Sequence, residues 1–206
     1  MNKIVIFDLD GTLIDSRELI LDCYREVTRE ICGQNINKIN NILIGPSLED
    51  TAKFILDKNF KRDYQQFKTK FISLHDEKLI NRTKEYKNAT NVIKYLFGKK
   101  YKIKIATNKR FLPTNKIINL FNWDKYIYSL CTSDDGDKKG NLTKFILNNF
   151  YDEYHFIGDT ISDAKIANDL NLIFYRAHYG YGNEENWNGI NVQFNLNSIN
   201  QLKRLL

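Results

Sequence analysis

Apolar residues recur along this chain with two different periods, and these periods predict its elements. A short apolar, β-branched run at positions 3–7 stops abruptly at Asp8-Leu9-Asp10-Gly11-Thr12. Runs of this kind are typical of a strand buried on both faces of a parallel sheet. We therefore predict a buried first strand whose end carries two acidic residues.

A helical pattern extends from about residue 16 to residue 82. Leu19, Cys23 and Val27 are spaced to share one helix face. Gly45-Pro46 interrupts the pattern, and Ser47 followed by Asp50 is typical of a capped helix start. No convincing strand occurs in this stretch, so we predict that residues 16–82 form a small helical insert.

Strands and helices alternate after about residue 83. This strict alternation predicts a parallel sheet covered by helices on both faces. The predicted fold class is therefore α/β, with a Rossmann-like core formed by residues 1–15 and 83–206 and interrupted by the helical insert. The predicted strands are 101–107, 126–131, 154–157 and 172–175, and the predicted helices lie near 92–97, 115–121, 142–150 and 163–170.

Composition limits the class of protein and the compartment in which we expect it. Of the 206 residues, 42% are hydrophobic and 27% charged, which is ordinary for a globular protein. No apolar run approaches the roughly 20 residues of a membrane span, and the N-terminus does not have the pattern of a signal peptide. The three cysteines are odd in number and form no CxxC pair, which favours a reducing, cytoplasmic setting. The net charge of +6 is scattered, so we expect neither a nucleic-acid nor a membrane partner.

Polar residues follow the predicted strands at the points where these end. Ligands of open parallel sheets bind at the carboxyl ends of the strands, where segments far apart in the sequence converge. We therefore expect one site at this edge. Its candidate residues are Asp8, Asp10, Thr107, Asn108, Lys138, Lys139, Asp159 and Asp163.

The candidate carboxylates suit a divalent cation and phosphorus chemistry. Crowded carboxylates repel one another, and Mg²⁺, which prefers oxygen ligands, removes that repulsion. Asp8 and Asp159 supply carboxylates, the Asp10 carbonyl can add an oxygen, and Asp163 can support the metal site. A carboxylate can also attack phosphorus directly and form an aspartyl-phosphate.

Catalysis of phosphoryl transfer depends on placing donors and positive charge around the transferred group. Thr107 fits the donor role, and either Lys138 or Lys139 fits the charge role. Asp10 can protonate the leaving oxygen and then activate water. Lys109 and Arg110 can meet an anionic group, or they can form a plain surface pair.

These motifs resemble those of the haloacid dehalogenase superfamily in type and order. The run at 8–12 resembles the first motif, Ile105-Ala106-Thr107-Asn108-Lys109 the second, and Gly158-Asp159 with Asp163 the fourth. Lys139-Gly140 resembles one common form of the weakly specified third motif, Lys138 is nearly as good a candidate, and Lys144 is a distant third. The position of the insert resembles the helical-cap subgroup, and Tyr179-Gly180-Tyr181-Gly182 is similar to its phosphoglycolate-phosphatase-type members.

The resemblance implies a Mg²⁺-dependent hydrolase of phosphoric monoesters, acting on a small phosphorylated metabolite through an aspartyl-phosphate. It implies that residues 16–82 are a cap domain. Many relatives have a proline where Arg110 and Gly140 stand here, which leaves the choice of lysine open. The implied roles are Asp8 as nucleophile and metal ligand, Asp10 as general acid/base and metal ligand, Thr107, Asn108 and Lys139 as phosphate-binding residues, Asp159 as metal ligand, and Asp163 as support of the metal site.

Other functions fit the same motifs. A phosphomutase resembling β-phosphoglucomutase keeps the same pair of aspartates, and a nonenzymatic binding protein can use the same scaffold. A receiver-type signalling domain also gathers aspartates at strand ends, but it has no room for the insert at 16–82. The substrate, and whether the protein is a monomer or a homodimer, stay open.

Overall fold

The structure is a computed structural model that describes residues 2–33 and 44–206. The chain divides into two compact units, one of Met1–Asp15 with Lys84–Leu206 and one of Ser16–Thr83. None of the described helices has the length and apolar character needed to cross a membrane. The three cysteines of the chain, Cys23, Cys32 and Cys131, are free thiols.

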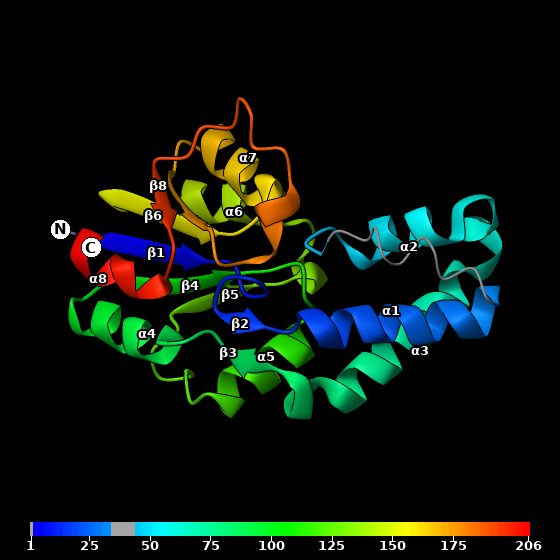
Figure 1. The fold of residues 1–206 in the computed structure, drawn as a ribbon. Helices are drawn as coiled ribbons and strands as arrows, with labels where there is room; N and C mark the ends of the chain where they lie inside the picture. Colours follow the sequence, from blue (N-terminus) through cyan, green and yellow to red (C-terminus); the bar gives the residue numbers. More distant parts are fainter. Residues whose placement is uncertain (1, 34–43) are drawn as a thin grey trace. The chain divides into compact units, whose positions relative to one another are not determined.

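A six-stranded parallel sheet forms the centre of the first unit (Figure 1). The first strand, β1, lies inside it between β4 and β6, in register with both. The predicted α/β class and parallel sheet are confirmed, whereas the short edge strand β8 was not predicted. In spatial order the strands are β5 (Ser129–Cys131), β4 (Lys102–Ala106), β1 (Lys3–Phe7), β6 (Glu153–Gly158), β7 (Ile173–Ala177) and β8 (Phe194–Leu196).

Helices cover both faces of this sheet (Figure 1). On one face Ile6, Phe156 and Phe174 pack in a core cluster with Leu142 and Ala164 from two of the helices, α6 and α7. Helices α4 and α5 lie on the other face (Figure 1). The helices are α4 (Ala89–Gly98), α5 (Phe111–Leu120), α6 (Lys138–Leu147), α7 (Ile161–Asp169) and α8 (Leu202–Leu205), with short 3₁₀ turns η3 (Ser133–Asp135), η4 (Tyr181–Glu184) and η5 (Ile199–Gln201).

Several helices begin earlier than their apolar pattern indicates, because polar caps start them. The Asp137 carboxylate accepts a hydrogen bond from the Gly140 N–H, so α6 begins at Lys138 rather than at Leu142. Thr160 and Asp163 form a capping box, so α7 begins at Ile161. Both first turns therefore lie close to the carboxyl ends of the strands.

The second unit is helical in its described parts. Its elements are α1 (Arg17–Cys32), α2 (Leu48–Leu56), the 3₁₀ turn η2 (Asp57–Asn59) and α3 (Phe60–Arg82). Tyr24 of α1 packs against Phe67 and Phe71 of α3. Ser47 caps α2 by accepting a hydrogen bond from the Asp50 N–H at 3.1 Å, as expected. Positions 34–43 of the predicted helical stretch lie outside the described residues.

A small two-stranded antiparallel sheet lies where the chain leaves the first unit and returns to it. It pairs β2 (Ile14–Asp15) with β3 (Lys84–Glu85), in the register Ile14 with Glu85 and Asp15 with Lys84. These two-residue strands were not predicted, since such short segments carry no periodicity. The pairing holds together the two segments of the first unit that flank the helical insert in the sequence.

Candidate active site

Asp8 begins the site, because it follows β1 directly and β1 is an interior strand. Its N–H donates a hydrogen bond to the Ile157 carbonyl at 2.8 Å, so the first residue after the strand is still bound to β6. Phe7 pairs with Ile157 in the parallel register, and Asp159 follows β6 in the same direction. The end of β1 and the end of β6 thus place two aspartates side by side.

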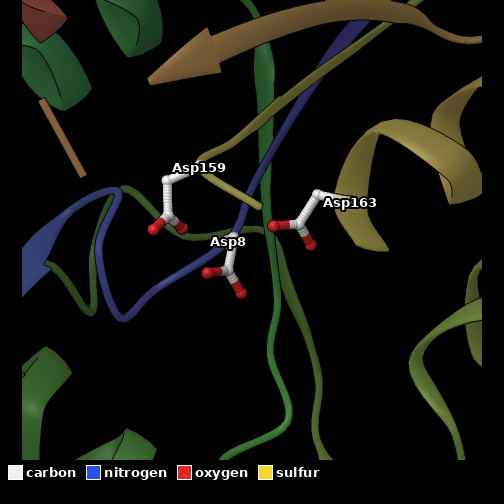
Figure 2. Close-up of side chains that lie close together, drawn as sticks. All are labelled: Asp8, Asp159 and Asp163. Atoms are coloured by element: carbon white, nitrogen blue, oxygen red, sulfur yellow. The ribbon is translucent and has the colours of Figure 1, made fainter. Parts of the chain in front are cut away.

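Three buried carboxylates converge at this edge, those of Asp8, Asp159 and Asp163 (Figure 2). One oxygen from each lies within 4.8 Å of the others. Asp8 and Asp159 come from strand ends, and Asp163 comes from the first turn of α7. Such a set of oxygens is the donor set that Mg²⁺ prefers in proteins.

The turn after Asp8 packs directly against Asp159. Gly11 has a φ of +86°, and a Cβ at this position would collide with the Asp159 carboxylate. Thr12 Oγ1 donates to Asp159 Oδ1 at 3.3 Å, and the N–H of Tyr181 donates to Asp159 Oδ2 at 2.7 Å. Glycine in the first motif therefore allows the close approach that fixes the orientation of Asp159.

Lys138 places one ammonium group between two of the carboxylates. Its Nζ lies 2.7 Å from Asp8 Oδ1 and 2.8 Å from Asp163 Oδ1. The other oxygen of Asp163 accepts hydrogen bonds from the hydroxyl of Thr160, at 2.7 Å, and from its N–H, at 3.2 Å. Asp163 thus caps α7 and holds Lys138 with the same carboxylate.

Burial sets the ionisation of this cluster. Burial raises the pKa of Asp8 to about 7, with Lys138 opposing the shift and the charge of Asp163 adding to it. Burial also raises the pKa of Asp159 well above its ordinary value, as do the charges of Asp8 and Asp163. Burial opposes the charge on Lys138, but Asp163 and Asp8 outweigh it and hold the pKa of that ammonium above its usual range. One ammonium cannot neutralise three carboxylates, so the ionised cluster favours a bound divalent cation.

Asp10 lies two residues beyond Asp8, with its carboxylate beside a second lysine. The Nζ of Lys109 is 3.2 Å from Asp10 Oδ2, and the two side chains are only 7% and 17% exposed. The two lysines of the site therefore contact different carboxylates, Lys138 those of Asp8 and Asp163, and Lys109 that of Asp10.

Thr107 and Asn108 follow β4, the neighbour of β1. The N–H of Thr107 donates to the Cys131 carbonyl at 2.9 Å, and its hydroxyl accepts from the Lys109 N–H at 3.1 Å. A hydroxyl that accepts one hydrogen bond keeps its own proton to donate. Thr107 is buried and Asn108 is partly exposed at this edge.

Lys139, the preferred lysine of the third motif in the sequence analysis, lies elsewhere in the structure. Its Nζ is 2.7 Å from Asp169 Oδ2, and its side chain is 52% exposed. Consecutive helix residues project about 100° apart, so only one of the two lysines in the first turn of α6 can face the carboxylates. The structure brings Lys138 to the cluster and does not bring Lys139 there.

Residues 5–177, most of the chain, match the family described as haloacid dehalogenase-like hydrolase. The chain belongs to this family. The resemblance stated from the motifs is therefore confirmed, and with it the class of the enzyme, a hydrolase.

The named relatives of this hydrolase are phosphatases and pyrophosphatases. The chain is 24% identical to the pyrophosphatase PpaX of Listeria welshimeri over 82% of its own length and 80% of that protein. It is 25% identical to the phosphoglycolate phosphatase of Aquifex aeolicus over 87% of its length and 86% of that protein. A solved structure of a predicted phosphoglycolate phosphatase from Haemophilus somnus superposes with a TM-score of 0.87, at 17% identity, covering 99% of this chain and 97% of that one. This last likeness shows a shared fold.

Three contacts of this family member's site were not predicted. The hydrogen bond from Thr12 and the ion pair of Lys109 involve side chains inside the quoted motifs, so the motifs held a signal for them. The hydrogen bond from Tyr181 uses only a main-chain N–H, which any residue except proline offers. Its one sequence signal is the pair of glycines around Tyr181.

Proposed function

We propose that this hydrolase is a Mg²⁺-dependent phosphatase of a small phosphorylated metabolite, with Asp8 as its nucleophile. One observation carries the proposal, the contact of the Lys138 ammonium with Asp8 inside a buried group of three carboxylates. A lysine there can hold a phosphoryl oxygen beside the attacking carboxylate, and the carboxylates can hold the cation.

The donor set fits Mg²⁺. Asp8 and Asp159 supply carboxylate oxygens, and Asp10 supplies its main-chain carbonyl. Asp163 belongs to the same carboxylate group and holds Lys138 with one oxygen and Thr160 with the other, so it supports and orients the metal site. When bound, the metal neutralises the carboxylates and the phosphoryl oxygens and so lowers the cost of bringing them together.

The first step transfers the phosphoryl group to Asp8. An Asp8 oxygen forms a bond to phosphorus while the bond from phosphorus to the leaving oxygen breaks. Lys138 and the Thr107 hydroxyl hold the phosphoryl oxygens, with Asn108 at the same strand end. Asp10 donates a proton to the leaving oxygen, so the product departs as an alcohol or acid.

The second step returns the nucleophile. Asp10, now ionised, takes a proton from water, and the water oxygen attacks the phosphorus of the aspartyl-phosphate. The bond between Asp8 and phosphorus breaks, and inorganic phosphate leaves. Asp10 is thereby protonated again for the next turnover.

We also propose roles for the insert and for the setting of the enzyme. Residues 16–82 would act as the cap that admits substrate and excludes bulk water, with its two ends tied by the β2–β3 pair. The names of the relatives, phosphoglycolate phosphatase and pyrophosphatase, support a small phosphorylated substrate. The three free thiols support a reducing, cytoplasmic setting.

The proposal is tested by phosphate release from a panel of phosphorylated metabolites and an aryl phosphate, with Mg²⁺ or with a chelator. Wild-type enzyme should release phosphate only with the metal, and Asp8→Asn should release none. Asp169→Asn, an exposed aspartate paired with Lys139, is the matched control and should keep full activity. Turnover that survives in Asp8→Asn would refute the nucleophile, and transfer of the group to a second substrate without release would establish a mutase.

A further inference from the structure

Lys109 is held at a fixed place on the active-site edge of the sheet. Its N–H donates to Thr107 Oγ1 at 3.1 Å, and its carbonyl accepts from the Ser133 N–H at 3.1 Å. Thr107 directly follows β4, and Ser133 begins η3 just after β5. Two adjacent strand ends therefore fix the backbone from which this lysine projects.

The side chain of Lys109 extends to the carboxylate that has the acid/base role. Its Nζ lies 3.2 Å from Asp10 Oδ2, and only 7% of its side chain is exposed. Lys138, in contrast, contacts Asp8 and Asp163. One ammonium thus lies beside the nucleophile and the other beside the general acid.

These two places correspond to opposite sides of the reacting phosphorus. In phosphoryl transfer the attacking and leaving oxygens are roughly in line. If Asp8 attacks, Asp10 must come within hydrogen-bond reach of the leaving oxygen in order to protonate it. An Nζ 3.2 Å from Asp10 Oδ2 is then within roughly 6 Å of that leaving oxygen.

We propose that Lys109 binds the leaving group, and that this enzyme prefers phosphate esters or anhydrides whose leaving group carries its own negative charge. A carboxylate or a second phosphoryl group one or two bonds from the leaving oxygen lies within reach of the ammonium. Lysine carries three donors on a flexible stem, so Lys109 can keep Asp10 and bind such an anion together. A charge-assisted hydrogen bond then favours the anionic leaving group over a neutral one of the same size. This inference rests on the proposed phosphatase reaction.

A purely positioning role for Lys109 predicts a different result. If Lys109 only orients Asp10, its removal slows the protonation of every leaving group by a similar factor. If it binds the leaving group, the loss is much larger for anionic leaving groups than for neutral ones. The two roles therefore separate when substrates differ in one charge and little else.

The test uses 2-phosphoglycolate and its uncharged amide, 2-phosphoglycolamide, as a matched pair of substrates. Lys109→Met should lower kcat/KM for the acid at least about tenfold and for the amide less than about threefold. Lys109→Arg should restore most of the loss. Lys139→Met, which removes an exposed lysine of the same charge, is the control and should change neither substrate.

A binding measurement makes the result independent of turnover. In the Asp8→Asn background, calorimetry with Mg²⁺ should show tighter binding of the acid than of the amide, and Lys109→Met should remove this difference. Equal losses for acid and amide, or no preference in the parent protein, would overturn the role of Lys109. Absence of phosphate release from every substrate would instead refute the proposed phosphatase, while the binding arm would still decide on Lys109.

Discussion

The Nζ atom of Lys138 lies 2.7 Å from Oδ1 of Asp8, although 130 residues separate them in the chain. Two local rules produce this contact. The Asp137 cap starts α6 at Lys138, and the parallel sheet brings the end of β1 to the same edge. The ammonium stabilises the ionised form of a buried carboxylate, which is the form that can attack phosphorus.

Replacing Lys138 by methionine should lower activity strongly. The variant keeps the length of the side chain but removes the charge that, in the proposed mechanism, holds the phosphoryl group, and one lost donor of this type lowers kcat about 10²- to 10³-fold. It also leaves Asp8 and Asp163 without their shared partner, so the metal-free protein should lose about 3 kcal/mol of stability. Steady-state kinetics and urea unfolding measure the two effects.

Lys139→Met is the matched control for this variant. Its Nζ contacts Asp169 at the surface, and an exposed pair of this kind contributes little. Its kcat and unfolding midpoint should equal those of the wild type. Activity lost in Lys139→Met and kept in Lys138→Met would reverse our assignment of the lysine.

The pKa of Asp8 predicts how metal binding depends on pH. Without metal this pKa is about 7, raised from the ordinary value of 3.8. The folded protein therefore holds a proton that the unfolded chain lacks between these values, and stability falls as pH rises through this window. The proposed metal site needs ionised carboxylates, so Mg²⁺ should raise Tm more at pH 8 than at pH 5.5.

Thermal unfolding with and without saturating Mg²⁺ checks this prediction. We expect a gain of about 5–10 °C at pH 8 and less than half of that at pH 5.5. Asp8→Asn removes both the titration and one ligand, so its gain should be small at both pH values. A gain of equal size at the two pH values in the wild type would contradict the link between metal and Asp8.

The sequence predicted the sheet better than it predicted the contacts of the site. A continuous apolar, β-branched run such as 3–7 is typical of a buried strand, and two acids directly after such a strand are not typical of a plain turn. The preference for Lys139 over Lys138 rested on the resemblance of Lys139-Gly140 to the third motif, while the apolar pattern placed the start of α6 near Leu142 and so said nothing about which lysine faces the site. The cap at Asp137, a local polar signal, decides it.

Contacts made by the main chain could not be predicted from the sequence for a different reason. Tyr181 orients Asp159 through its N–H, which no side-chain pattern reveals. The strand pair β2–β3 has only two residues on each side, too few to show an alternation. Motif spacing shows which side chains carry the chemistry of the site. The hydrogen bond from Tyr181 and the β2–β3 pair depend instead on the path that the loops take, which the motifs do not show.

Gly180 should be needed for metal binding because the chain passes so close to Asp159. A Cβ at Gly180 would collide with Asp159 Cβ and with the Gly11 carbonyl, neither of which is the far end of a flexible side chain. Gly180→Ala should therefore displace Asp159, weaken Mg²⁺ binding at least about tenfold and lower stability by about 2 kcal/mol. Gly98→Ala, where a Cβ meets nothing within 4 Å, is the control and should change neither Mg²⁺ affinity nor activity. Calorimetric titration measures these affinities. The prediction is wrong if Gly180→Ala binds Mg²⁺ as tightly as the wild type does.

His155 should make the fold sensitive to acid, independently of the active site. Its Nδ1 lies 3.1 Å from the Tyr175 hydroxyl and its Nε2 lies 3.1 Å from Glu153 Oε2. A neutral ring that accepts from Tyr175 and donates to Glu153 satisfies both contacts. Burial lowers the pKa of His155 below 6.5, although Glu153 opposes the shift.

The sign of this effect is opposite to that of Asp8. Between pH 6.5 and the lowered pKa of the folded state, the unfolded chain binds a proton at His155 that the folded chain does not. The contribution of His155 to stability is therefore complete above pH 6.5 and is lost as pH falls, with a slope of up to about 1.4 kcal/mol per pH unit. Urea unfolding of wild type and His155→Gln, both with chelator, should give free energies of unfolding that converge as pH falls from 7 to 5. Because Asp8 is present in both proteins, their difference isolates the histidine, and parallel curves would show that folding does not lower the pKa of His155.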